Sequence, residues 1–351
     1  MPRMGLKVDR KMPDAVVKGF LPFGMSVLIL AGLYYASAII APVTFAVFII
    51  TIVWPLQSVL ERTIPSPLAL VVTLLITLAT IGGLVLLFLW AFGLIVEWLV
   101  ANADRFQVLY AQATEWLYVH GVSIEALVAD SYSPSLLSGA ARRVGGSGYR
   151  LVSFIIIAFA FTVLGLLEVD ALRGKIEQLR NPKIRETFLL VGKDIAAKMR
   201  RYMLVRSIMS VLTGLVVWCF ALTAGIELAT AWGIIAFVLN YIPFIGPLVA
   251  TVFPTLFALV QFGSLKLAIG VFACLNFIQF FIGSYLEPRI AGAALSISPF
   301  VVLLAVFFWS FLWGISGAFM GVPIMIAVLA LCQLHDSTQW IATLLAGKST
   351  K

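Results

Sequence analysis

Residues 228–265 read LATAWGIIAFVLNYIPFIGPLVATVFPTLFALVQFGSL, a run that carries no charged side chain. A helix rises about 1.5 Å per residue, so this run is too long for one upright crossing of a hydrocarbon core about 30 Å thick. Three prolines interrupt it, Pro243, Pro247 and Pro254, and proline both removes a backbone donor and disfavours a continuous helix. Irregular backbone at membrane depth persists only where protein buries it or where it lines a wet cavity. The stretch therefore predicts a membrane span that is broken or re-entrant.

The composition of the whole chain agrees with a membrane location. Of the 351 residues, 62% are hydrophobic and 11% are charged, and the mean hydropathy is +1.07; soluble domains are about 45–50% apolar and about 25% charged. Such a chain lacks the polar side chains that would cover the surface of a soluble enzyme. The formal charge of +8 fits orientation in the membrane and contact with anionic lipid rather than nucleic-acid binding. The sequence thus predicts an all-α, polytopic helical membrane protein.

Charge-free runs divide the chain into about eight transmembrane spans. The run between Lys18 and Glu61 is long enough for two spans, with a turn expected near Ala41 and Pro42. The sixth span is the stretch quoted above, and the eighth is also expected to be broken, by glycines and a proline. The six later spans are expected at 63–96, 151–167, 207–226, 228–265, 267–286 and 290–334.

These spans group into four regions. Residues 1–98 hold a basic N-terminal tail and the first three spans, and residues 99–150 form an extracytoplasmic segment. In that segment, apolar residues at helical spacing from Phe106 to Leu117 predict an amphipathic helix, and a glycine-rich hinge follows it. Residues 151–206 hold the fourth span and a basic cytoplasmic segment, and residues 207–351 form a motif-rich C-terminal half for transport.

The basic residues predict the orientation of these spans. With eight spans both termini lie on one side, and 19 of the 24 Lys and Arg residues fall in segments on that side. Because cytoplasmic segments are enriched in Lys and Arg, we expect both termini and residues 169–206 in the cytoplasm. The inner set comprises five residues before the first span, Arg62, ten residues within 169–206, Lys266, Lys348 and Lys351. The outer set comprises Arg105, Arg142, Arg143, Arg150 and Arg289.

Signatures of enzymatic chemistry are scarce. The two histidines, His120 and His335, are far apart in the sequence, and no GxxxxGK[ST] nucleotide-binding motif occurs. Neither a metal-ligand cluster nor a catalytic triad is indicated. We therefore expect no catalytic site, no metal and no cofactor, so that active transport would have to draw on an ion gradient or on the gradient of the solute.

The candidate functional residues are those that interrupt the spans. Asn240, Pro243, Gly246 and Pro247 place an amide and freed carbonyls in the middle of an apolar segment. In secondary transporters such breaks form substrate sites. The alternative is a proline kink that only improves packing, and the sequence leaves both possibilities open.

Two further pairs of polar residues follow this break, one within the seventh expected span and one just beyond its end. Asn276 and Gln279 are three residues apart, so they share a helix face and either line a polar path or join helices by hydrogen bonds. Glu287 and Arg289 are the one acid and the one base between two apolar runs. They are candidates for a gate or a proton relay, and the alternative is a solvated anchor at the membrane interface.

The last constellation is WGISGAFMGVP at residues 313–323. Gly314, Gly317 and Gly321 are three and four residues apart, so in a helix they would form one small-residue face that permits close helix contact. A hinge from Gly321 to Pro323 is the alternative. Gly317 and Pro323 are the candidate path residues of this constellation.

Taken together, four motifs resemble the autoinducer-2 exporter family of bacterial permeases. In order they are YMLVRSIMSVLTG, LNYIPFIGP, YLEPRIAGAALSISP and GISGAFMGVPIM, beginning at residues 202, 239, 285 and 314. The likeness covers nearly the whole chain in layout and is most specific from about Arg201 to Val328. The family positions carried over to this sequence are Asn240, Pro243, Gly246, Pro247, Glu287, Pro288, Gly292, Pro299, Gly317 and Pro323.

The resemblance implies a bacterial inner-membrane permease that assembles into homo-oligomers and exports a small polar solute. The leading expectation is a secondary permease for a molecule like autoinducer-2, the signal of quorum sensing. A sodium or proton antiporter is the alternative, although the candidate acids Glu97, Glu168, Glu227 and Glu287 all fall at expected span ends. A non-transporting membrane scaffold, which would use the basic segment for docking, is the second alternative.

Overall fold

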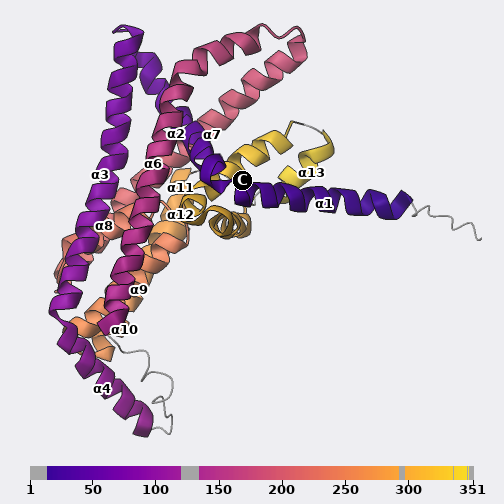
Figure 1. The fold of residues 1–351 in the computed structure, drawn as a ribbon. Coiled ribbons are helices and arrows are strands. Elements are labelled where there is room, and N and C mark those ends of the chain that lie inside the picture. The colour runs from indigo at the N-terminus through magenta and orange to yellow at the C-terminus, as the bar shows by residue number, and fades with distance from the viewer. Residues whose placement is uncertain (1–13, 120–133, 292–296, 335, 346, 348–351) are drawn as a thin grey trace, which may run out of the picture.

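A computed structural model describes residues 14–119, 134–291, 297–334, 336–345 and 347 (Figure 1). Its described residues are almost entirely helical and form no strand, which confirms the all-α prediction. In chain order the helices are α1 (Asp14–Tyr35), α2 (Ser37–Leu60), α3 (Ser66–Ala101), α4 (Ala103–Val119), α6 (Pro134–Glu177), α7 (Pro182–Thr223), α8 (Ala229–Leu239), α9 (Ile245–Phe262), α10 (Leu265–Phe280), the π-helix η1 (Phe281–Leu286), α11 (Glu287–Ala291), α12 (Pro299–Cys332) and α13 (Asp336–Leu345).

Within the described ranges, seven segments are long and apolar enough to cross a membrane. They are α2, α3, the part of α6 from Val152, α7, α9, α10 continued to Ile290, and α12. The apolar stretch Gly24–Tyr35 of α1 and the helix α8 are shorter. Half of the residues in the most apolar stretch of α12 are buried inside the protein, against 11% of those in the most apolar stretch of α3. The protein is therefore polytopic, with α3 at the periphery and α12 enclosed.

The first two expected spans join at a different place from the one predicted. The chain turns at Ala36, where α1 ends and α2 begins, and not near Ala41 and Pro42. Pro42 is buried inside α2, where its missing N–H costs a single helical hydrogen bond, and membrane helices tolerate such a loss. Figure 1 shows α1 projecting sideways from the bundle at this turn.

The two ends of the bundle can be recognised from the long hairpins. Figure 1 shows the α6–α7 hairpin at one end and α4 at the other. We call the end with the α6–α7 hairpin the basic end and the end with α4 the far end. A helix, α4, occupies the position of the expected amphipathic helix, and Gly145 to Gly148 lie inside α6. The amphipathic character of the segment and the hinge remain predictions.

Helices α8 and α9 are the two arms of a re-entrant hairpin with its tip at residues 240–244. At its base, near the far end, the Glu227 amide donates to the Gln261 side-chain oxygen at 2.9 Å, and the Gln261 amide donates to the Gly225 carbonyl at 2.8 Å. Further in, the rings of Trp232 and Phe257 lie 5.3 Å apart. The sixth expected span is therefore broken as predicted, and its two arms begin and end at the same end of the bundle.

This re-entry corrects the predicted sides of two basic residues. Arg201 donates to the Ile290 carbonyl at 2.8 Å, so Arg289 lies at the basic end. Lys266 follows the base of the hairpin and lies at the far end, close in sequence to Gln261. The prediction had placed them the other way round because it assumed that the sixth span crosses. One basic residue moves in each direction, so the split of 19 to five is unchanged.

Helix α12 also folds back on itself. Gly314 has φ 65° and ψ −141°, a conformation open to glycine and very costly for other residues. Beyond it, Gly317 lies directly against the Trp309 carbonyl, and a Cβ at Gly321 would lie 2.9 Å from the Ala305 carbonyl. The arms are therefore antiparallel. The expected single glycine face is wrong, and the break lies at Gly314 and not at Gly321 to Pro323.

The α12 hairpin enters from the basic end. The Ser298 amide before its first arm donates to the Leu345 carbonyl at 3.1 Å, and Gln333 after its second arm accepts from Lys198 of α7 at 3.5 Å. Its tip contacts the end of α1, where Trp313 donates to the Leu33 carbonyl at 3.1 Å. The bundle thus contains two re-entrant hairpins that enter from opposite ends.

Candidate functional site

One face of α7 carries buried polar residues at the level where the two hairpins meet. Tyr202, Arg206 and Ser210 are spaced by four residues, so they share a helix face. They are 6%, 7% and 0% exposed. Together with groups from the α8–α9 tip and from α11 they form what we call the polar cluster: Tyr202, Arg206, Ser207, Ser210, Asn240, Tyr241 and Glu287.

The tip of the α8–α9 hairpin is fastened to α7 by two neutral hydrogen bonds. The Asn240 amide donates to the Ser210 hydroxyl at 3.2 Å. The Tyr241 hydroxyl and the Ser207 hydroxyl are 3.0 Å apart and hydrogen-bonded. Asn240 is 5% exposed, so its amide has the protein partner that burial requires. The tip of the broken span is therefore packed against α7 in this structure.

The charged part of the cluster is a two-point ion pair between α7 and α11. Arg206 Nη2 lies 3.2 Å from Glu287 Oε1, and Nη1 lies 3.3 Å from Oε2. The side chains are 9% and 25% exposed. A charge in a membrane span is expensive unless it is paired, and here each charge compensates the other. Glu287 thus pairs with Arg206 and not with Arg289, the base nearest to it in the sequence.

The backbone of the tip is strained. Phe244 has φ 63° and ψ −48°, which for a non-glycine residue costs about 1–3 kcal/mol. Pro243 precedes it, and the Ile245 amide bonds back to the Pro243 carbonyl at 2.7 Å. Gly246 lies directly against the Leu239 carbonyl, where no side chain would fit. Pro243, Gly246 and Pro247 therefore serve the tight reversal that presents Asn240 and Tyr241 to α7.

The second arm of α12 lies on the other side of the tip. The Tyr241 ring is 6.4 Å from the Phe319 ring, and Phe319 also contacts Phe45 and Phe48 of α2 at 5.6 and 6.0 Å. Ile242 packs in the same buried cluster as Val306, Met320 and Val322. Gly317 and Pro323 flank this contact and are buried. The structure thus brings the α8–α9 tip and the α12 constellation into contact, and Glu287 of the remaining constellation joins them through α7.

Three predicted residues lie apart from the others. Asn276 is exposed and donates to the Phe272 carbonyl of its own helix at 2.9 Å. Arg289 is exposed, with its guanidinium carbon 3.9 Å from the centre of the Tyr285 ring. Gln279 is half-buried, and its side-chain nitrogen has no partner among the described residues. Gly292, a family motif position, falls outside the described residues.

Sequence reasoning missed the α7 side of the cluster. Arg206 was counted as the last charge of the basic segment, and Tyr202, Ser207 and Ser210 appeared only within the first family motif and were not named as candidate site residues. The signal was nevertheless present, because polar residues repeat at four-residue spacing in the otherwise apolar run from Tyr202 to Ser210. Only the pairing with Glu287, 81 residues away, required the structure.

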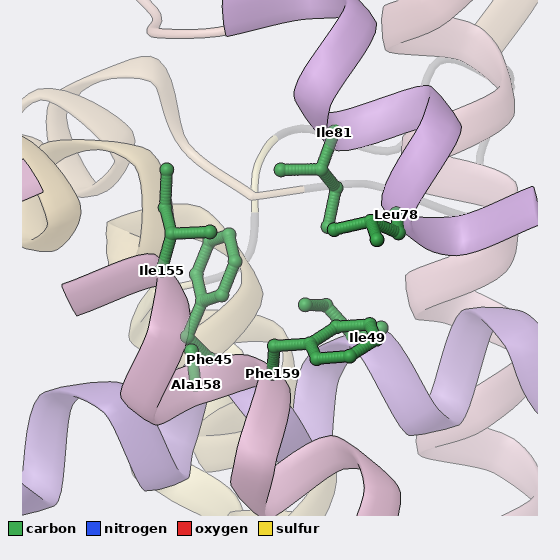
Figure 2. A pocket seen from close by; sticks show the side chains of 7 residues that line it. All are labelled: Phe45, Ile49, Leu78, Ile81, Ile155, Ala158 and Phe159. Carbon is green, nitrogen blue, oxygen red and sulfur yellow. The ribbon is translucent and has the colours of Figure 1, made fainter. Parts of the chain in front are cut away.

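Two cavities lie outside the polar cluster. A cavity of about 10 Å³ between α2, α3 and α6 is lined entirely by apolar side chains (Figure 2): Phe45, Ile49, Leu78, Ile81, Ile155, Ala158 and Phe159. A groove of about 340 Å³ between α7 and α8 is lined mainly by apolar residues, among them Trp218, Ile234 and Phe237. The first is at the lower limit for one water molecule and offers it no polar partner. Neither cavity is lined by a residue of the polar cluster.

Metal chemistry has no visible basis at the site. Within the ranges that the structure describes, no group of three or more His, Cys, Asp or Glu side chains is placed to hold a metal ion. The cluster instead offers hydroxyls, an amide and one compensated ion pair. Such groups recognise polar molecules by hydrogen bonding.

Comparisons with known proteins identify the family of this chain. The sequence model of the family described as AI-2E family transporter matches residues 23–335 of this chain. The chain is 30% identical over 340 residues to the AI-2 transport protein TqsA of Escherichia coli (strain K12), covering 94% of this chain and 96% of the relative. It is 27% identical over 304 residues to the protein YhhT of the same organism, covering 85% of each chain. The family match over residues 23–335 and the likeness to TqsA show that the chain belongs to the AI-2E transporter family.

Proposed function

We propose that this protein is a secondary permease that exports a small polar solute of the autoinducer-2 type along the contact between its two re-entrant hairpins. Membership of the family supports a membrane permease for a small solute. The likeness to the AI-2 transport protein TqsA supports an autoinducer-2-like molecule as the first solute to test. The observation that carries the proposal is the meeting of the α8–α9 tip and α12 at the buried polar cluster.

The physical reason lies in the thickness of the barrier. The two hairpins enter the bundle from opposite ends and meet at their contact. The protein layer that separates the two sides of the membrane is therefore thin at this contact. At that barrier the α8–α9 tip is held by two neutral hydrogen bonds, each worth about 0.5–1.5 kcal/mol net. A movement that breaks them is therefore within the reach of solute binding energy. The strained Phe244 lowers the cost of moving the tip further.

Sodium or proton antiport, the alternative from the sequence, is disfavoured by the ion pair of the site. Glu287 is the one carboxylate of the polar cluster, and it is paired with Arg206. An exchanged cation would have to take that carboxylate from the guanidinium. Autoinducer-2 export and cation exchange can be separated by imposing sodium and pH gradients on the same vesicles.

The proposed setting is the bacterial inner membrane, with both termini and the α6–α7 hairpin on the cytoplasmic side. The ten Lys and Arg residues of 169–206 support this orientation and a contact with anionic lipid. Assembly into homo-oligomers follows from the family resemblance, and the many exposed apolar side chains of the spans are available for lipid or for a second copy.

The test compares two amide-to-leucine substitutions in reconstituted vesicles. Asn240→Leu removes the bond between the hairpin tip and Ser210, and we expect it to reduce autoinducer-2 flux several-fold. Asn276→Leu is the matched control, since that amide is exposed and bonds only to its own helix; its flux should equal that of the wild type.

A second variant separates flux from stability. Asn240→Leu leaves the buried Ser210 hydroxyl without its partner, at a cost of about 1–3 kcal/mol. Adding Ser210→Ala removes that orphaned hydroxyl and should restore thermal stability while flux stays low. Normal flux in the double variant, or no autoinducer-2 flux in the wild type, would contradict the proposed function.

A further inference from the structure

Two polar groups in the cluster are buried without a hydrogen bond. Arg206 uses both terminal nitrogens on Glu287, and its Nε has no partner among the described residues. The Tyr202 hydroxyl also lacks one. Both side chains are more than nine-tenths buried. Buried polar groups in native proteins are almost always satisfied, so two adjacent exceptions require an explanation.

The two groups lie on neighbouring turns of the same helix face. Tyr202 and Arg206 are four residues apart on α7, and the guanidinium carbon lies 5.7 Å from the centre of the Tyr202 ring. By hydrogen-bond geometry, neither the Tyr202 hydroxyl nor Arg206 Nε has a partner among the described residues. A single oxygen atom placed between them would accept from Nε–H and would bond to the hydroxyl at the same time.

From this arrangement we infer that Tyr202 and Arg206 form a subsite for a hydroxyl or carbonyl oxygen of the transported solute. The inference rests on the proposed transport function and adds to it the residues and the chemistry of recognition. Ser207, next to Arg206 in the chain, holds the hairpin tip through Tyr241. A solute in the subsite would therefore lie beside the contact that has to open.

The charges of the site restrict the solute to neutral molecules. The Arg206–Glu287 pair has no net charge, and each terminal nitrogen of Arg206 contacts one of the two carboxylate oxygens. An anion would have to displace the Glu287 carboxylate or meet its repulsion. A cation would have to take Glu287 away and leave the guanidinium uncompensated, which is costly in a buried site. A neutral hydroxylated molecule needs only the two groups that are free.

The experiment measures thermal stabilisation of the purified full-length protein by autoinducer-2. Tyr202→Phe removes only the hydroxyl and keeps the ring beside Arg206. We expect autoinducer-2 to raise the melting temperature of the wild type, and the half-maximal concentration to rise about tenfold in Tyr202→Phe, as for the loss of one good hydrogen bond. Tyr285→Phe is the matched control, because that exposed ring stacks under Arg289 away from the cluster, and its response should equal that of the wild type.

A second substitution tests the guanidinium itself. Arg206→Lys keeps a positive charge opposite Glu287 but supplies no donor at the Nε position. We expect the stabilisation by autoinducer-2 to weaken at least as much as in Tyr202→Phe. Sodium chloride is compared with choline chloride at equal ionic strength, and we expect no sodium-specific stabilisation.

Several results would overturn the subsite. They are an equal response of wild type and Tyr202→Phe, no response of the wild type to autoinducer-2, a sodium-specific response, or a lower melting temperature of solute-free Tyr202→Phe, which would mean that the hydroxyl already has a partner. Flux in vesicles separates this inference from the proposed function. Flux that does not depend on Tyr202 would reject the subsite and keep the permease, whereas binding that depends on Tyr202 without any flux would do the reverse.

Discussion

Glu287→Gln tests the energetic role of the ion pair, because it removes the charge that compensates Arg206. Breaking a buried pair by removing one partner costs about 3–5 kcal/mol. The Glu287 side chain is 25% exposed and Arg206 is 9% exposed, so the pair is partly screened and we expect the lower end, about 3 kcal/mol. The uncompensated guanidinium remains buried among α7, α11 and the hairpin tip, and this is the physical origin of the loss.

The assay is the free energy of unfolding of the purified protein in detergent, measured by denaturant titration. Replacing both partners, as Arg206→Met with Glu287→Leu, removes the stranded charge and should recover most of the loss, since apolar replacements of buried pairs are often neutral. Arg289→Gln is the control, and for an exposed residue we expect a change within about 0.5 kcal/mol. The single variants Arg206→Met and Glu287→Leu are measured alongside the double variant. A double variant whose loss of unfolding free energy equals the sum of their two losses would refute the reasoning.

Three further predictions concern topology, the α12 hairpin and lipid contact. On a background without the three native cysteines, an impermeant thiol reagent outside intact cells should label Lys266→Cys but not Gln178→Cys; labelling of both from one side would contradict the re-entrant α8–α9 hairpin and the proposed orientation. Gly314→Ala forces a side chain into a positive-φ conformation and should destabilise the protein by at least about 1 kcal/mol, measured by thermal unfolding, and an unchanged melting temperature would mean that the break lies elsewhere. Replacing the exposed Arg180 and Lys183 by Gln should weaken association with liposomes that contain anionic lipid by about 1 kcal/mol for each charge, and equal association would leave these charges with a topological role alone.

Much of the fold was predictable because it depends on local properties of the chain. Long charge-free runs must be helical in lipid, where every backbone group needs a partner within its own segment. The prolines at 243 and 247 indicated the break in the sixth span, and the glycines after Trp313 indicated one in the eighth. The predicted turn near Ala41 and Pro42 was wrong. Pro42 lies inside α2, where it removes one backbone hydrogen bond, and a membrane helix tolerates that loss.

The direction of the broken spans was not predictable in the same way. A stretch of about 35 apolar residues fits a kinked crossing or a hairpin equally well by length. The choice depends on packing between distant residues, such as Gln261 against Gly225 or Gly321 against Ala305. The positive-inside count could not detect the error, because Lys266 and Arg289 exchanged sides one for one.

The sequence by itself determined that this chain is a polytopic helical membrane protein with two broken spans, since hydropathy and helix-breaking residues act locally. It also identified Asn240 as an amide within an apolar segment and Glu287 as an acid between two apolar runs. Only the tertiary structure decided their partners, Ser210 and Arg206. The physical reason is that a buried polar group needs a partner somewhere, but many side chains could meet that need, and only the packing of α7 against the hairpin tip and α11 selects which one does.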